Sequence, residues 1–145
     1  SRSRFGLELW PRQEVKPWFR DNQDRLTAVL FAIDQSPSNS KNAYWMRFLN
    51  QDTAVLFGTE YYAVQYDLPV IFGRIGRLRR GYYEFSFEVV EEHPKEAPYG
   101  AITERNTRLL EKDILAEPAY WLWTHRRWKH ERPADVEVAG KDETQ

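Results

Sequence analysis

The most regular hydrophobic pattern in the chain lies between residues 82 and 90, where apolar and polar side chains alternate. An extended backbone with this sequence places Tyr83, Phe85, Phe87 and Val89 on one face. The pattern predicts a strand with one buried face and one wet face, as antiparallel sheets allow. Residues 70–75 predict the preceding strand, and residues 77–81, Arg-Leu-Arg-Arg-Gly, predict the hairpin loop between them.

Residues 27–33, TAVLFAI, form an unbroken apolar run with β-branched and aromatic members. Such a run predicts a central strand that is covered on both faces. It ends at Asp34 and Gln35, and residues 36–40 predict a loop. Because α/β proteins bind ligands beyond the carboxyl ends of their strands, Asp34 is a candidate site residue. An Asx-turn that caps the loop is the equally supported alternative.

Helical periodicity predicts a helix over residues 101–115, in which Glu104 and Arg108 are spaced to form an ion pair. Asp52 is a good N-cap for a second helix over residues 53–66, which Asp67-Leu68-Pro69 ends. The weaker predictions are a strand at residues 5–10, a helix at 17–25, an edge strand or packed loop at 43–49, and a connection at 91–100.

These elements predict an α/β fold with a small mixed β-sheet of about three to five strands, flanked by helices. With 145 residues the chain has the length of one domain, which we place at residues 1–133. The acidic residues 134–145 predict a disordered tail. The absence of cysteine excludes disulfides, thiolate zinc sites and a cysteine nucleophile. The net charge of −1 disfavours a general nucleic-acid binder, and no apolar run approaches the ~20 residues of a membrane span.

Residues 117–133, EPAYWLWTHRRWKHERP, combine tryptophans with cations. Pro118 suits the first position of a helix, and such a helix would place Trp121, His125 and Trp128 on one face. The cations at its end have a structural interpretation, because they complement the helix dipole and stack on tryptophan.

The order WLWTHRRWKHERP also resembles the C-terminal signature of the late acyltransferases of lipid A biosynthesis, the lauroyl/myristoyl transferase family. The resemblance continues through nearly residues 1–133 in the same order. It includes Ile33-Asp34-Gln35, Arg47-Phe48-Leu49-Asn50, Thr53, Leu68-Pro69-Val70 through Arg74, and Arg2–Gly6. Asn50 departs from the pattern, because glycine is usual at that position.

The resemblance implies the C-terminal portion of a glycerolipid-acyltransferase-like fold. It implies acyl transfer from an acyl carrier protein thioester to a hydroxyl of a lipid A precursor, without a cofactor or a metal. The donor would be acyl carrier protein and the acceptor a lipid A precursor, with no nucleic-acid partner. The parent protein would act at the cytoplasmic face of the bacterial inner membrane, and the fragment itself would be soluble.

This family works through a His-x4-Asp/Glu box upstream of the matched region. The chain contains only His93, His125 and His130, and His130 with Asp135 has the spacing of the box. That pair lies across Pro133, where no rigid element would orient it. We therefore expect the general base outside these residues, and an inactive C-terminal half whose open sheet edge favours self-association.

Asp34 is the expected supporting residue of the catalytic site, and Arg74, Arg126 and Arg127 are expected to bind acidic substrate groups. Gln35, Arg47 and His125 are further substrate-binding candidates, with a hydrogen bond in the core as the favoured alternative for His125. Two other functional classes stay open. One is a non-catalytic module whose tryptophan- and arginine-rich segment contacts phosphates or nucleic acid, and the other is a protein-interaction domain with exposed aromatic residues.

Overall fold

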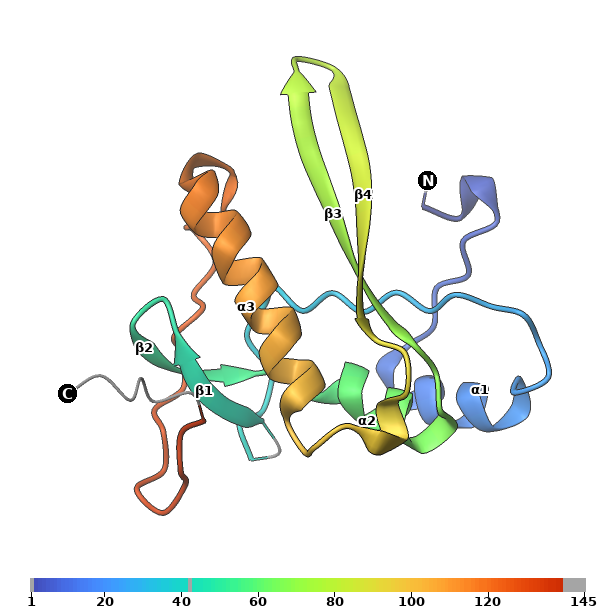
Figure 1. Cartoon of the computed structure of the whole chain (residues 1–145), viewed down its shortest axis with the longest axis horizontal. Coiled ribbons are helices and arrows are strands. Elements are labelled where there is room, and N and C mark those ends of the chain that lie inside the picture. Colours follow the sequence, from blue (N-terminus) through green and yellow to red (C-terminus); the bar gives the residue numbers. More distant parts are fainter. Residues whose placement is uncertain (1, 42, 140–145) are drawn as a thin grey trace. The chain divides into compact units, whose positions relative to one another are not determined.

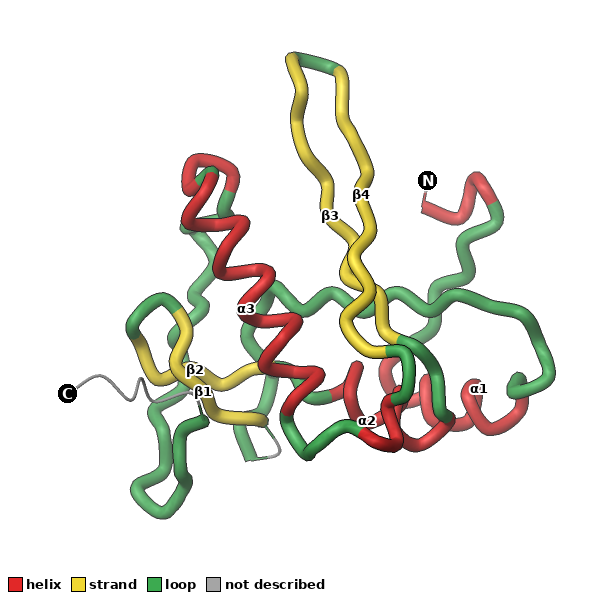
Figure 2. Tube along the Cα trace, in the orientation of Figure 1, coloured by secondary structure: helices red, strands yellow, loops and turns green. Residues whose placement is uncertain are grey.

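The computed structural model describes residues 2–41 and 43–139. The chain forms two compact units, residues 1–30 and residues 31–145. One domain over residues 1–133 with a separate tail stays a prediction. Figure 1 shows the elements in chain order, and Figure 2 distinguishes helices, strands and loops. The α/β class is confirmed, and the described residues contain four strands, within the expected three to five. They form two separate two-stranded antiparallel sheets rather than one mixed sheet.

The first unit contains two 3-10 helices, Arg2–Phe5 and Arg12–Glu14, and the helix α1 (Val15–Asp21). The helix expected at residues 17–25 therefore exists, two residues earlier and shorter. The strand expected at residues 5–10 is wrong, because Gly6 turns the chain with a φ of 85° and residues 7–10 are irregular.

The strand expected at residues 27–33 is also wrong, because these residues are irregular. A strand needs a neighbour for its backbone hydrogen bonds, and no segment of the described chain pairs with this one. Leu30 is accordingly 85% exposed. The apolar composition of the run predicted burial on both faces, but composition alone does not supply the partner strand.

The second unit begins with a tight hairpin of β1 (Tyr44–Phe48) and β2 (Gln51–Val55). Leu49 and Asn50 connect the strands with positive φ at both positions, the geometry of a two-residue hairpin turn. Of the two alternatives for residues 43–49, an edge strand or a packed loop, the strand is confirmed over Tyr44–Phe48. The helix expected from Thr53 is wrong over its first turn, because those residues form β2, and α2 spans only Gly58–Tyr66 before Asp67 ends it.

The second hairpin pairs β3 (Val70–Arg79) with β4 (Tyr82–Glu91). Both predicted strands are confirmed, but the loop expected at residues 77–81 is shorter, because β3 continues through Arg79. The turn consists of Arg80 and Gly81, and Gly81 has a φ of 82°. The predicted burial of one face is wrong over most of β4, where only Val90 is buried and Glu91 partly so. Figure 1 shows the hairpin projecting beyond the helices of its unit.

A long helix, α3 (Ala101–Ala116), follows the short 3-10 helix Pro94–Glu96 and confirms the predicted helix. The buried carboxylate of Glu60 on α2 accepts backbone N–H groups of Gly100 and Thr103 and so fixes the start of α3. The expected Glu104–Arg108 pair is replaced, because Glu104 accepts from Tyr44 and Arg108 donates to Glu111. The core between α2, α3 and the base of the second hairpin comprises Ala63, Val70, Phe72, Val90 and Ile102.

The predicted tryptophan-rich helix is wrong. A 3-10 helix covers only Pro118–Tyr120, and residues 121–133 are irregular. In the stretch expected to be a disordered tail, Val138 is buried and Ala139 pairs in parallel with Met46 of β1. Residues 140–145 lie outside the described residues. Within those residues, no helix has the length and apolar composition needed to cross a bilayer.

Candidate functional site

The irregular segment of residues 121–133, which we call the aromatic segment, is anchored on the first hairpin. Arg127 is 3% exposed, and its Nη1 donates to the Ala54 carbonyl at 2.8 Å. Its guanidinium carbon lies 5.5 Å from the centroid of the Phe48 ring. Trp128 Nε1 donates to Thr53 Oγ1 at 2.8 Å. These contacts to β1 and β2 explain why the segment is not helical, since its side chains reach partners that a helix would not have met.

Residues 34–37, which we call the Asp34 loop, are bound to the same segment. The Ser36 backbone N–H donates to His125 Nε2 at 3.0 Å, and His130 Nε2 lies 2.7 Å from the Pro37 carbonyl. A carbonyl only accepts, so His130 carries its proton on Nε2, whereas His125 Nε2 accepts and must be unprotonated. The two histidines therefore hold the loop with opposite hydrogen-bonding roles, and the core role favoured for His125 agrees with this geometry.

The electrostatics of this region centre on Arg127. Burial lowers the pKa of Arg127 to about 10, and the carboxylate of Asp34 acts in the opposite direction. The guanidinium therefore remains charged at neutral pH, with partly buried Asp34 as its counter-charge. Arg127 Nε and Ser36 Oγ are buried without a hydrogen-bond partner among the described residues. Two polar groups in this region thus retain unused hydrogen-bonding capacity.

Three of the predicted site residues, Gln35, Arg47 and Arg126, are exposed. Gln35 follows Asp34 and Arg126 precedes Arg127, and both side chains are exposed. Arg47 is exposed on β1 and lies 3.3 Å from Asp52, whose other oxygen accepts from Arg132 at 2.9 Å. The hydrogen bonds from Arg132 and then Arg47 lower the pKa of Asp52. Asp52 thus joins the hairpin to the end of the aromatic segment instead of capping a helix.

Arg74 lies in a different environment, between β4 and α3. Its Nε is 2.7 Å from both carboxylate oxygens of Asp113, and Nη2 is 3.5 Å from Glu88. The hydrogen bond to Asp113 raises the pKa of Arg74. The structure therefore brings Asp34, His125 and Arg127 into one cluster, with Gln35 and Arg126 next to it in sequence. Arg74 is engaged by two carboxylates of other elements.

Residues 1–130 match the family model described as bacterial lipid A biosynthesis acyltransferase. The chain belongs to this acyltransferase family. The match includes the Asp34 loop and residues 121–130 of the aromatic segment, so both histidines and Arg127 lie within the family's sequence pattern. Searches of curated proteins and of solved structures found no match.

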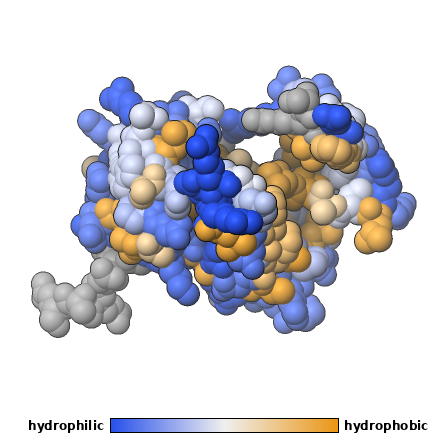
Figure 3. Space-filling model, turned by 90° about the horizontal axis from the view of Figure 1, so that it is seen from above, coloured by the Kyte–Doolittle hydropathy of each residue, from blue (hydrophilic) through white to orange (hydrophobic). Residues whose placement is uncertain are grey.

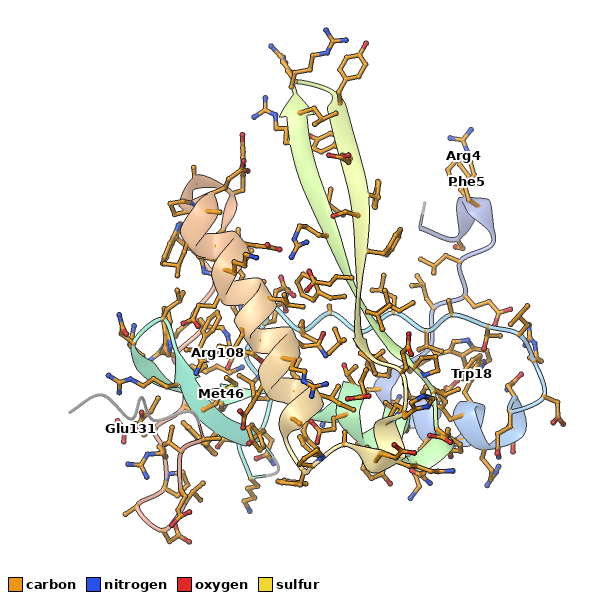
Figure 4. The ribbon with its side chains drawn as sticks, viewed as in Figure 1. Arg4, Phe5, Trp18, Met46, Arg108 and Glu131 are labelled. Carbon is orange, nitrogen blue, oxygen red and sulfur yellow. The ribbon has the colours of Figure 1, made fainter. Side chains whose placement is uncertain are left out.

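Sequence reasoning about this acyltransferase missed four groups that build the site: Thr53, Ser36, the Pro37 carbonyl and Arg132. A usable signal was the pair Leu49-Asn50 between two short apolar stretches, which is consistent with a hairpin turn. That turn would have placed Thr53 on a strand. The contacts of Ser36 and Pro37 span about 90 residues of sequence and have no local signal. Met46 of β1, labelled in Figure 4, is fully buried and pairs with Thr53 across the first hairpin.

Proposed function

We propose that the chain contributes the substrate-gripping part of an enzyme that moves a fatty acyl group from an acyl carrier protein thioester to a hydroxyl of a lipid A precursor. Acyltransferase function in general follows from the family. The observation that supports the rest is the joining of the Asp34 loop to the aromatic segment through His125, His130 and Arg127. This joining places candidate polar groups from two distant parts of the chain in one region.

In this proposal Arg127 acts as a positioning residue. Its burial prevents direct contact with a large substrate, but its charge holds the Asp34 carboxylate in place. Asp34 then supports the polar network at the floor of the site. The exposed side chains of Arg126, Gln35 and Arg47 are available to the phosphates of the acceptor and to the phosphate-linked arm of the donor. Arg74 contributes at the second hairpin, where Asp113 orients it.

The reaction needs a base to remove the proton of the acceptor hydroxyl. The hydroxyl oxygen then attacks the thioester carbon, a tetrahedral oxyanion forms, and the thiol leaves. His125 Nε2 accepts from the Ser36 N–H and His130 Nε2 donates to the Pro37 carbonyl, so both rings hold the Asp34 loop in place. We infer that the general base is supplied by polypeptide other than these residues. The base-bearing parent enzyme acts at the bacterial inner membrane in this proposal.

Substrate binding by the 145-residue chain tests the gripping role without requiring turnover. Titration with a phosphorylated lipid A precursor and with its dephosphorylated analogue compares the two affinities. We expect the phosphorylated compound to bind about tenfold more tightly, and Arg126→Ala to remove most of the difference. Arg12→Ala, an exposed arginine of the first unit, is the matched control and should change nothing. Equal affinity for both compounds would contradict the proposal.

Turnover tests the inference about the base. The chain alone, incubated with acylated acyl carrier protein and the precursor, is expected to give no acylated product by mass spectrometry. Product formation by the chain alone, lost in His130→Gln, would show that the His130–Asp135 pair is catalytic after all. A nucleic-acid module is not favoured, because Arg127 is buried and Trp128 is partly buried and bonded to Thr53, which leaves neither free to stack on bases.

A further inference from the structure

The second hairpin displays one continuous apolar face. Cross-strand pairing puts Ile71 beside Val89 and Ile75 beside Phe85, with Phe87 opposite Gly73 and Tyr83 opposite Arg77. Side chains of directly paired residues point to the same face of a sheet. The six large side chains of this face are 56–73% exposed: Ile71, Ile75, Tyr83, Phe85, Phe87 and Val89. An exposed apolar patch of this size marks an interaction surface.

The tip of the hairpin, residues 77–83, combines cations with amphipathic side chains. It carries Arg77, Arg79 and Arg80 and no acidic residue, although the chain as a whole has a net charge of −1. Leu78 at the tip is 68% exposed. Figure 3 views the hairpin from above, and its strongly hydrophilic tip faces the viewer with hydrophobic surface beside it. Figure 4 shows side chains at the turn of the hairpin pointing away from α2 and α3.

Two of the tip arginines, Arg77 and Arg79, contact aromatic rings rather than carboxylates. The guanidinium carbon of Arg79 lies 3.8 Å from the centroid of the Tyr82 ring, and that of Arg77 lies 5.9 Å from the Tyr120 ring. Among the described residues, no carboxylate forms an ion pair with any of the three tip arginines. Elsewhere in this unit Arg74, Arg105 and Arg108 each have a carboxylate partner. The positive charge of the tip is therefore uncompensated.

We propose that the tip and apolar face of the β3–β4 hairpin dock on the surface of an anionic lipid bilayer. Guanidinium groups bind lipid phosphates through paired hydrogen bonds, and tyrosine side chains favour the headgroup region. The apolar side chains enter the boundary beneath the headgroups, as amphipathic interfacial segments do. Docking stays shallow, because the outer edges of both strands carry unpaired backbone groups that need water.

A second copy of the chain is the competing occupant of the face. Two apolar faces stacked with opposite directions would bring each tip near the base of the other hairpin. The carboxylates of Glu88 and Glu91 at the base already pair with Arg74 and Arg105. The tip arginines would then lack partners, whereas a bilayer rich in phosphates supplies them. Charge complementarity thus favours the lipid surface.

Sedimentation with lipid vesicles tests the proposal on the intact chain. Vesicles of phosphatidylcholine alone are compared with vesicles that contain about 30% phosphatidylglycerol. We expect the anionic vesicles to bind about tenfold more tightly, with the difference decreasing at 0.5 M salt. Arg79→Glu/Arg80→Glu should abolish the preference, and Phe85→Ser/Phe87→Ser should weaken binding to both vesicle types. Arg12→Glu/Lys16→Glu makes the same charge change on exposed positions of the first unit and should bind like the wild type.

Equal binding to the two vesicle types, or an equal loss in the Arg12/Lys16 control, would overturn the proposal. A stable dimer in the absence of vesicles would also overturn it, if Phe85→Ser/Phe87→Ser dissociated the dimer and added vesicles did not. The apolar face would then be the contact with a second copy. The proposal rests on the proposed function only through the lipid nature of the acceptor. Vesicle binding is measured without substrates, so a negative result here leaves the precursor titration intact, and the reverse also holds.

Discussion

The aromatic segment and the β3–β4 hairpin are both rich in arginine and aromatic residues, yet the fold treats them in opposite ways. In the aromatic segment Arg127 is 3% exposed, lies against Phe48 and has Asp34 as its counter-charge. At the hairpin tip, Arg79 stacks on Tyr82 in the open, with no carboxylate partner among the described residues. The same residue types are thus buried in the aromatic segment and exposed to solvent at the hairpin tip.

The two regions differ in burial because they have different neighbouring residues. The aromatic segment lies on β1 and β2, where the Ala54 carbonyl and the Thr53 hydroxyl are available as hydrogen-bond acceptors. A buried guanidinium is tolerated only when such groups replace its water. Among the residues that the structure describes, the β3–β4 hairpin joins the core at its base, through Val70, Phe72 and Val90. An arginine-rich run therefore does not indicate by itself whether its charges bind a ligand or hold the fold.

The largest expected change in stability comes from comparing a buried and an exposed phenylalanine of the β3–β4 hairpin. Phe72 is 8% exposed at the base, and Phe87 is 73% exposed on the open face. Phe72→Ala should lower the free energy of unfolding by about 3 to 4 kcal/mol, because it leaves a cavity in the core. Phe87→Ala should change it by less than about 0.5 kcal/mol. Urea titration measures both, and equal losses would show that the open face is covered in solution.

Burial of the aromatic segment is tested next by comparing adjacent arginines. Arg127→Ala should cost about 2 to 3 kcal/mol, since it leaves the Ala54 carbonyl unsatisfied and removes the contact with Phe48. Exposed Arg126→Ala should cost less than about 0.5 kcal/mol and should act on substrate binding instead. Thermal and urea unfolding distinguish these outcomes. If Arg126→Ala were the more destabilising change, the assignment of buried and exposed roles would be reversed.

The role of Asp34 needs a double-mutant cycle. Asp34→Asn should cost about 1 kcal/mol in the wild type, because Arg127 loses its counter-charge. In an Arg127→Met background the same change should cost close to nothing, which isolates the coupling between the two charges. In the complete enzyme, a supporting role at the site also predicts a lower kcat for Asp34→Asn. A stability loss that persists unchanged in the Arg127→Met background would support the alternative, a loop capped by an Asx-turn.

The sequence anticipated the elements whose signal is local. The alternation of residues 82–90 identified β4, and the periodicity after Gly100 identified α3. The strand predicted at residues 27–33 and the helix predicted at the aromatic segment were wrong for the same reason. The conformation of both stretches depends on whether a partner distant in sequence is present. The hydrogen-bond partners of His125 and His130 are Ser36 and Pro37, about 90 residues away in the sequence. The family resemblance named both Asp34 and Arg127 as candidate site residues, but it did not indicate that Arg127 is buried.

The smallest expected effect concerns Tyr44, a partly buried group at the start of β1. Burial, and then its hydrogen bond to Glu104, raises the pKa of Tyr44. Above about pH 10 the unfolded chain therefore loses this proton before the folded chain does, and the stability that Tyr44 contributes decreases as pH rises. Arg127 acts with the opposite sign in the same range, since its pKa is lowered on folding.

The comparison of wild type with Tyr44→Phe removes the Arg127 contribution, which is common to both. We expect Tyr44→Phe to cost about 1 kcal/mol at pH 8 and to approach the wild type between pH 10 and 11. Tyr82→Phe, at an exposed position of the hairpin tip, is the matched control and should follow the wild type throughout. Parallel curves for wild type and Tyr44→Phe would mean that the Tyr44 hydroxyl is as accessible to water as the side chains of the open hairpin.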